Sequence, residues 1–279
     1  MYQPWTPSWV KRHFINYGST DDIPEDVFQR IRQAFQKQYS REPLVSIVMI
    51  AHNEERTILR SLSSLSELNS SYPVELIVVN NNCSDRTQEI LDRCGVHSVS
   101  QPIQGAGSAR DAGIQMAKGK FHLCADADTI YPPGWVDEMI APLEQGDAIC
   151  TYGAVSFLPD GKLSRFTLSF YELIKSAVIS LKAIRSPEWV AGGASMAFFT
   201  RMGKQIGWRT DLKRGEDSQM VLSMKRFGHI RQVTTEAARV WTSARTLDRE
   251  GSFARVIVSR VRKELNKIHF SLTNSGQSA

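Results

Sequence analysis

Short apolar runs alternate with helix-like segments between residues 44 and 130. The runs at 44–50, 74–79 and 121–125 are continuous, which is typical of strands buried on both faces of a parallel sheet. The short segment 96–100 predicts one more strand. The intervening segments carry apolar residues at helical spacing, as in Ile58, Leu62, Leu65 and Leu68. We therefore predict four parallel strands joined by three helices with right-handed crossovers.

The segments on either side of this region have different patterns. Before it, apolar residues recur every four positions behind a Pro at a favoured helix start, at Ile23, Val27, Ile31 and Phe35. This predicts a helix that packs on the main domain, with binding of a partner as the alternative. After residue 130 we expect helices at 135–144, 163–184 and 215–227, and strands at 148–155, 229–233 and 237–241. The apolar side of the helix at 163–184, with Phe166, Phe170 and Leu173, predicts core packing; the wall of an acceptor groove is the alternative.

The net charge of +5 is concentrated at one end of the chain. Residues 239–279 hold eight Lys/Arg and three Asp/Glu, so the other residues are balanced. A basic helix there predicts a solvated face, or contact with anionic lipid headgroups or a phosphate-bearing substrate; we expect no nucleic acid partner.

Cysteine usage and hydropathy indicate the compartment. The four Cys form no C-x-x-C pair, which argues against a zinc site or a disulfide framework and fits a reducing cytosol. Neither a signal peptide nor an apolar run of the ~20 residues that a membrane helix needs is visible. We expect a cytoplasmic protein, with peripheral contact at the inner face of the membrane as a further possibility.

Two carboxylates end the apolar run at 121–125. Asp126 and Asp128 lie where a parallel sheet presents the carboxyl ends of its strands, which is where ligands bind in such sheets. Their charge needs compensation, and a hard divalent cation is an obvious candidate. Chance alone gives about 0.7 Asp-x-Asp pairs in a chain with 14 Asp, so the pair needs further support.

That support comes from five ordered motifs. They are 45–55, 78–87, the Gly-rich stretch 105–113, Asp126-Ala127-Asp128 and Gly215-Glu216-Asp217. Over residues 44–228 the chain resembles the family 2 glycosyltransferases. The resemblance implies an α/β GT-A fold: a Rossmann-like, mostly parallel sheet flanked by helices, here with N- and C-terminal helical extensions. Together with the helical and basic patterns on either side, we predict an extension at 1–43, a GT-A domain at 44–241 with a nucleotide-binding half (44–130) and an acceptor half (131–241), and a basic helix at 242–279.

The resemblance also implies an activity. An inverting, metal-dependent enzyme would move a sugar from a UDP- or GDP-type nucleotide-diphospho-sugar to a hydroxyl of a glycan or lipid acceptor, in cell-surface glycan or glycolipid synthesis. Asp128 would bind Mn2+ or Mg2+, and Asp126 would support it or reach the ribose. Asp217 would be the general base, and Glu216 would contact the acceptor or orient the loop; helix N-terminal acids stabilised by the macrodipole are the structural alternative.

The remaining implied residues surround the nucleotide-sugar. They are Ala51, His52, Asn53, Glu54, Asn81, Gly107, Arg110 and Arg245. Asn53 could equally be a helix N-cap, and Arg110 a structural ion-pair partner. His52 stands where the family often has Tyr, and Asn80 and Asn81 stand where it usually has Asp, so the choice of nucleotide stays open.

Two other functions remain as alternatives. A nucleotidyltransferase on a related fold would need a Gly-rich phosphate loop with Lys or Arg directly after the first strand, where this chain has 52–55, His-Asn-Glu-Glu. A catalytically inactive sugar-nucleotide binding module is disfavoured because Asp128 and Asp217 are both present.

Overall fold

The computed structural model describes residues 5–159, 161, 163–183, 192–245 and 247. The chain divides into two compact units, and each is described by itself. The larger unit is built from residues 8–155 and 191–242, and it contains every strand of the main sheet. The smaller unit takes its described residues from 1–7, 156–190 and 243–279.

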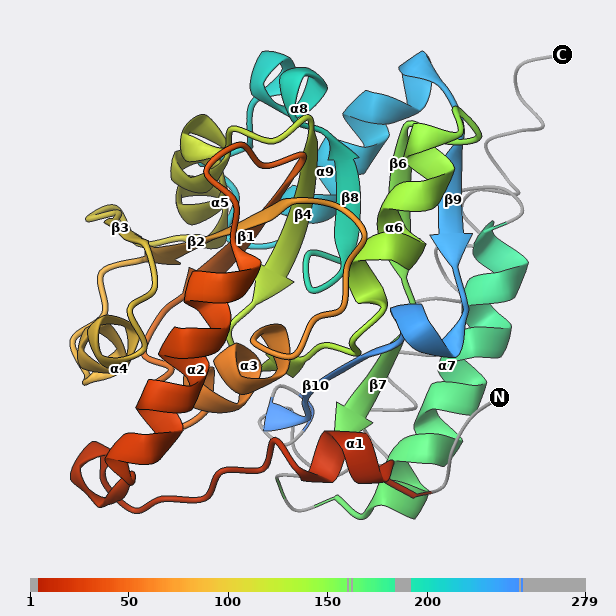
Figure 1. Cartoon of the computed structure of the whole chain (residues 1–279). Coiled ribbons are helices and arrows are strands. Elements are labelled where there is room, and N and C mark those ends of the chain that lie inside the picture. Colours follow the sequence, from red (N-terminus) through yellow and green to blue (C-terminus); the bar gives the residue numbers. More distant parts are fainter. Residues whose placement is uncertain (1–4, 160, 162, 184–191, 246, 248–279) are drawn as a thin grey trace, which may run out of the picture. The chain divides into compact units, whose positions relative to one another are not determined.

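The larger unit is organised around a sheet that has seven strands within the described residues, in the order β3-β2-β1-β4-β8-β6-β9 (Figure 1). β1 pairs in parallel with β2 and β4, β2 pairs in parallel with β3, and β8 runs antiparallel to β4 and β6. The strands are β1 (Val45–Ala51), β2 (Val74–Asn80), β3 (Ser98–Ser100), β4 (Phe121–Asp126), β6 (Cys150–Gly153), β8 (Met196–Phe199) and β9 (Ile230–Val233). The four parallel strands that the apolar runs predict are therefore confirmed, and the antiparallel β8 is inserted beside them.

The alternation of side chains along β1 divides the core between two helical layers. Ile47 and Met49 point into a cluster with residues of α2, α3, α4 and α6, whereas Val48 packs with Ala109 of α5 on the other face. On that second face α8 contacts α5 and α9. The helices are α2 (Glu25–Gln38), α3 (Ile58–Leu65), α4 (Thr87–Arg93), α5 (Ala106–Met116), α6 (Trp135–Glu144), α8 (Thr200–Ile206) and α9 (Glu216–Met224).

A short pair of antiparallel strands follows the end of β4. β5 (Thr129–Ile130) pairs antiparallel with β10 (Val240–Ser243), with Thr129 opposite Thr242.

Two glycines allow neighbouring segments to pack closely against β1. A Cβ at Gly113 would lie 2.3 Å from Val48 Cγ1, and one at Gly119 would lie 2.7 Å from Ser46 N. These contacts hold α5 and the start of β4 tightly against β1.

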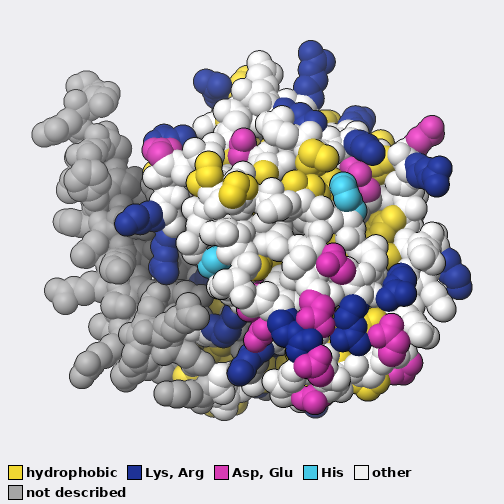
Figure 2. All heavy atoms as spheres, turned by 90° about the vertical axis from the view of Figure 1, so that its left-hand side faces the viewer, with side chains coloured by type: hydrophobic (Ala, Val, Ile, Leu, Met, Phe, Trp, Pro, Cys, Tyr) yellow, Lys and Arg dark blue, Asp and Glu magenta, His cyan; other side chains and the backbone are white. Residues whose placement is uncertain are grey.

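The predicted N-terminal helix belongs to the larger unit and packs against its core, as its periodicity predicts. After the short α1 (Ser8–Lys11), α2 buries Phe28, Ile31 and Phe35 in the main core. Ion pairs add to this contact: Arg86 Nη1 lies 2.6 Å from Asp21 Oδ2, and Arg93 Nη2 lies 3.0 Å from Glu25 Oε2. Figure 2 shows basic and acidic side chains gathered close together on this side of the molecule.

The smaller unit contains most of β7 (Val155–Leu158) and all of α7 (Arg165–Ala183). The prediction that Phe166, Phe170 and Leu173 form the packed side of this helix is wrong, because these side chains are exposed. Leu168 and Tyr171 are buried instead, packed with Phe157 and Leu247. Two residues that the apolar pattern leaves out are also buried, since Arg165 and Glu172 form a bidentate ion pair at 2.6 and 2.8 Å.

The basic helix expected at 242–279 lies mostly outside the described residues. Within the part of the chain that the structure describes, no helix is both long and apolar enough to cross a membrane.

Candidate active site

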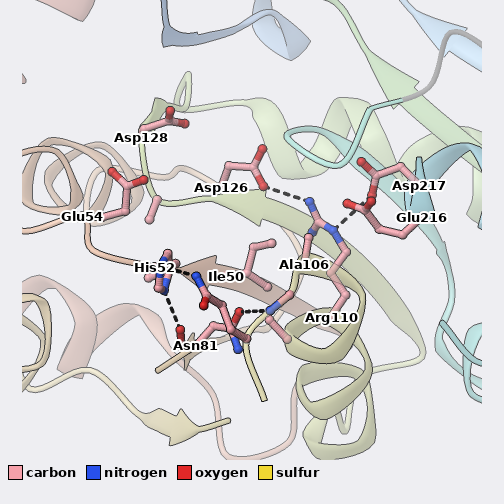
Figure 3. A pocket seen from close by; sticks show the side chains of 15 residues that line it. Ile50, His52, Glu54, Asn81, Ala106, Arg110, Asp126, Asp128, Glu216 and Asp217 are labelled. Carbon is pink, nitrogen blue, oxygen red and sulfur yellow. Dashed lines mark hydrogen bonds and ion pairs between the residues drawn. The ribbon is translucent and has the colours of Figure 1, made fainter. Parts of the chain in front are cut away.

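A cavity of about 430 Å³ opens where β1, β2 and β4 end and α5 and α9 begin (Figure 3). This is the sheet edge at which ligands bind in parallel α/β folds. The lining residues are Ile50, Ala51, His52, Glu54, Asn81, Gln104, Gly105, Ala106, Ala109, Arg110, Asp126, Ala127, Asp128, Glu216 and Asp217. Residues more than 160 positions apart in the sequence thus meet at one site.

Asp128 is oriented by two hydroxyl groups. Thr129 and Thr242, which face each other across β5 and β10, donate hydrogen bonds to its Oδ1 at 3.3 and 3.1 Å. Their hydroxyls also lie 3.0 Å from one another. The local pairing of two short strands therefore fixes the direction of the carboxylate.

The carboxylates of this site suit a divalent cation that binds together with a ligand. Among the described residues, no group of three or more His, Cys, Asp or Glu side chains could hold a metal ion by itself. Mg2+ in particular is usually bound through one or two carboxylates together with waters and the phosphate oxygens of a substrate. Asp126 and Asp128 line the cavity and offer that kind of donor set.

Asp217 and Glu216 open helix α9 on the other side of the cavity. The carboxylates lie in the first turn, where the helix macrodipole stabilises negative charge. Asp217 Oδ2 accepts a hydrogen bond from the backbone N–H of Gly193 at 2.8 Å. Burial raises the pKa of Glu216.

Arg110 lies between the two acidic groups. Its Nη2 donates to Asp126 Oδ1 at 2.9 Å, and its Nε lies 3.1 Å from Asp217 Oδ1 (Figure 3). The arginine is buried. The pKa of Asp126 is raised to about 6 by lost hydration, and the neighbouring Asp128 and Asp217 charges act in the same direction, opposed by Arg110.

His52 and Asn81 form the wall at the ends of β1 and β2. The carbonyl of Asn81 can only accept, so His52 Nδ1 donates to it at 2.8 Å and Nε2 accepts from the Gln104 side-chain amide at 2.8 Å. The Asn81 side chain hydrogen-bonds to the backbone of the loop after β3. Its amide donates to Gln101 O and Ile103 O, and its Oδ1 accepts from Gly105 N. Asn81 therefore shapes this wall through the loop that it holds.

Three of the predicted site residues do not line the cavity. Asn53 adopts a left-handed conformation (φ 54°), and its Oδ1 accepts from Ser84 N, so it ties together the two turns after β1 and β2. Gly107 lies against backbone, because a Cβ there would be 2.2 Å from Arg209 O. Arg245 belongs to the smaller unit, so its proposed role at the diphosphate stays a prediction.

Several residues at the site were not predicted from the sequence, Gln104 and Tyr131 among them. Gln104 lies in a polar loop with no motif that marks its side chain. Tyr131 accepts from the backbone N–H of Asp126 at 2.7 Å through its hydroxyl, which also contacts Ala194 O at 3.4 Å. An aromatic residue just after the Asp-x-Asp pair was visible in the sequence, but its contact with residue 194 depends on the fold.

The sequence and fold agree with one known family. A sequence model described as Glycosyl transferase family 2 matches residues 46–205, more than half of the chain. The chain belongs to glycosyl transferase family 2. An uncharacterized glycosyltransferase from Haemophilus influenzae is 30% identical over 119 residues, which are 40% of this chain and 36% of that protein. This family 2 chain therefore matches only about a third of that relative's length.

Two solved structures share the fold of this family 2 chain. One is glucosyl-3-phosphoglycerate synthase from Mycobacterium tuberculosis in complex with Mn2+, UDP-glucose and phosphoglyceric acid (TM-score 0.54, 20% identity, 90% of this chain and 85% of that chain). The other is a mannosyltransferase from Pyrobaculum calidifontis in complex with GDP-Man and Mn2+ (TM-score 0.56, 18% identity, 77% and 62%). At these identities the likeness establishes the fold, and the predicted GT-A fold is confirmed.

Proposed function

We propose that this chain is an inverting, metal-dependent glycosyltransferase. It would move a sugar from a nucleotide-diphospho-sugar to an acceptor hydroxyl. The observation that carries the proposal is the meeting of Asp126, Asp128 and Asp217 at one cavity on the carboxyl edge of the parallel strands. Family membership and the two solved relatives, which hold UDP-glucose or GDP-Man together with Mn2+, support the same reaction class.

Asp128 and Asp126 form the donor side in this proposal. Asp128, held by Thr129 and Thr242, would bind Mn2+ or Mg2+, with Asp126 beside it. The cation would neutralise the charge that develops on the leaving diphosphate. Glu54 lines the same side of the cavity, where a third carboxylate would attract the cation or hold a ribose hydroxyl.

Asp217 forms the acceptor side. An acceptor hydroxyl must lose its proton as it attacks, and a carboxylate within hydrogen-bond reach contributes about 10²–10⁴ in rate. Asp217 Oδ1 is buried 3.1 Å from Arg110 Nε, and the side chain as a whole is 20% exposed, so Oδ2, which accepts from Gly193 N–H, is the oxygen that would also accept from a hydroxyl. A direct displacement of the diphosphate by that hydroxyl inverts the anomeric centre. Glu216 would orient the acceptor next to it.

The nucleoside would bind between β1 and β2. We assign it to Ala51 and the face of His52, whose ring edge is held by Asn81 O and Gln104. The donor class is a UDP- or GDP-sugar. Residues 44–130 would then form the nucleotide-binding half and residues 131–241 the acceptor half.

The proposed acceptor is a glycan or a lipid-linked glycan in surface-glycan synthesis. The motivation is the basic segment at 239–279, which suits anionic headgroups. Co-sedimentation of the full chain with vesicles that contain anionic lipid tests this part: salt-sensitive binding supports it, and the absence of binding at low salt contradicts it.

Calorimetric titration with UDP-, GDP- and dTDP-sugars, each with and without Mn2+, tests the donor site. We expect one nucleotide class to bind at least ten times more tightly with Mn2+, because the metal joins the diphosphate to Asp128. Failure of every donor to bind in the presence of Mn2+ would overturn the proposal.

A further inference from the structure

One buried guanidinium joins the two sides of the cavity. Arg110 extends from α5, and its Nη2 and Nε reach Asp126 at the end of β4 and Asp217 at the start of α9, at 2.9 and 3.1 Å. Two different nitrogens serve two different carboxylates. The planar fork of arginine holds two N–H groups in fixed directions for this arrangement, whereas the ammonium of lysine is a compact charge at the end of a flexible chain.

The surroundings of Arg110 leave the guanidinium little room to move. The side chain is only 3% exposed, and its Cζ lies 5.5 Å from the centre of the Trp208 ring, which is itself buried. An arginine over an aromatic face in a desolvated place is stabilised by cation–π attraction. The contact of Arg110 with both Asp126 and Asp217 is called the bridge below. Trp208 packs on one side of its guanidinium, and the two carboxylates hold the guanidinium by charge.

The backbone of Gly193 closes the other side of the bridge. A Cβ at this position would lie 1.8 Å from Arg110 Nη2 and 2.6 Å from Asp217 Oδ1, which is far inside van der Waals contact. The N–H of the same residue donates to Asp217 Oδ2 at 2.8 Å. The adjacent Gly192 differs, because a Cβ there would meet no atom of the described residues within 4 Å.

We propose that Arg110 is a positioning residue that links Asp126 on the donor side to Asp217 on the acceptor side. Gly193 is required because any side chain at that position displaces the guanidinium. This inference rests on the proposed function, since it concerns how the base is held. Arg110 acts through the two carboxylates and does not need to touch the donor.

The bridge has a consequence for catalysis. Asp217 stands at the start of a helix, and the same guanidinium lies 3.1 Å from its Oδ1 and 2.9 Å from Asp126 Oδ1. The guanidinium compensates both sides and fixes the direction of the Asp217 carboxylate toward the cavity. A displacement of the base by about 1 Å can cost about 10²-fold in rate, so loss of the bridge lowers turnover even when the donor binds normally.

A pair of neighbouring glycines gives a matched experiment. Gly193→Ala and Gly192→Ala each add one methyl group to the same turn, and only the first meets the bridge. With the donor that the titration identifies, we expect Gly193→Ala to lower kcat by about ten- to a hundredfold while donor Kd stays within about threefold. Gly192→Ala keeps the kcat of the unmodified chain. Equal kcat values for the two variants would overturn the requirement for glycine.

Arg110→Lys tests the bridge from its other end. It keeps the charge and loses the second contact, so we expect the same fall in kcat with little change in donor Kd. The double variant Arg110→Lys/Gly193→Ala should be no slower than the worse single variant, since both act on one guanidinium. A donor Kd weakened by tenfold or more in Arg110→Lys, with kcat unchanged, would make Arg110 a donor contact and contradict the inference.

A measurement without turnover keeps the inference testable where a variant folds poorly. The Nε–H resonance of Arg110 in the ¹⁵N-labelled chain, assigned by its loss in Arg110→Lys, should be protected from solvent and should shift in Asp217→Asn. An Arg110 Nε–H signal that does not respond to Asp217→Asn would overturn the bridge. Absence of donor-dependent turnover in the unmodified chain would instead refute the proposed function, and the resonance would still report whether the bridge exists.

Discussion

Replacing Asp217 with Asn removes the proposed base and changes little else in size. Both carboxylate oxygens of Asp217 have partners, Oδ1 the Arg110 guanidinium and Oδ2 the Gly193 N–H. An amide has only one oxygen, so its NH₂ must face one of these two donors. Loss of a hydrogen bond to a charged group costs about 1.5–3 kcal/mol, which adds a small loss of stability to the chemical effect.

The chemical effect is the larger one. Loss of a general base lowers the rate by about 10²–10⁴, equivalent to about 3–5 kcal/mol in the activation free energy. The assay compares kcat by nucleotide release and donor Kd by calorimetry, in Asp217→Asn and in Asp211→Asn. Asp211 is an exposed control: it pairs with Arg209 at 2.6 Å and is 61% exposed. We expect Asp217→Asn to lose transfer while donor Kd stays within about threefold. A kcat within tenfold of the unmodified chain would refute the role of Asp217.

Three further predictions concern the metal, the smaller unit and pH. Asp128→Ala should abolish the Mn2+ dependence of donor binding, and an unchanged Kd with Mn2+ in calorimetry would contradict its role as ligand. Glu172→Leu removes the carboxylate that pairs with the buried Arg165, so denaturant unfolding should show a free energy of unfolding lower by about 3–5 kcal/mol. Asp147→Ala, which breaks an exposed pair, should lower it by at most about 1 kcal/mol. Burial lowers the pKa of His122 to about 3, so below pH 6.5 the unfolded chain takes up a proton that the folded chain does not. The free energy of unfolding, measured with denaturant, should therefore fall from pH 6.5 toward pH 4, and it should fall less steeply in His122→Leu.

Three strands of the parallel half, β1, β2 and β4, were predictable because they are buried on both faces. Such strands appear as unbroken apolar runs, and the first helix between them, α3, has a clear apolar stripe at 3.6-residue spacing. The pattern failed for α7, where an apolar stripe at Phe166, Phe170 and Leu173 is exposed. The ion pair of Arg165 and Glu172 is buried instead, and hydrophobic periodicity treats charged residues as surface.

The site was predictable only as a set of motifs. Sequence order placed Asp126, Asp128 and Asp217 in one family pattern, and the structure brings all three to the same cavity. Their partners depend on tertiary contacts: Gly193 meets Arg110 and Asp217, and Thr242 reaches Asp128 from more than a hundred residues away. Residues of these types occur throughout the chain, so composition and spacing give them no distinguishing signal.

The decisive measurement is nucleotide release from the preferred sugar donor, followed with and without Mn2+ and with extracts that contain acceptors. We predict release that needs Mn2+ or Mg2+, increases with acceptor and falls by about 10²–10⁴ in Asp217→Asn. Release that is equally fast without a divalent cation, or in Asp217→Asn, would contradict it.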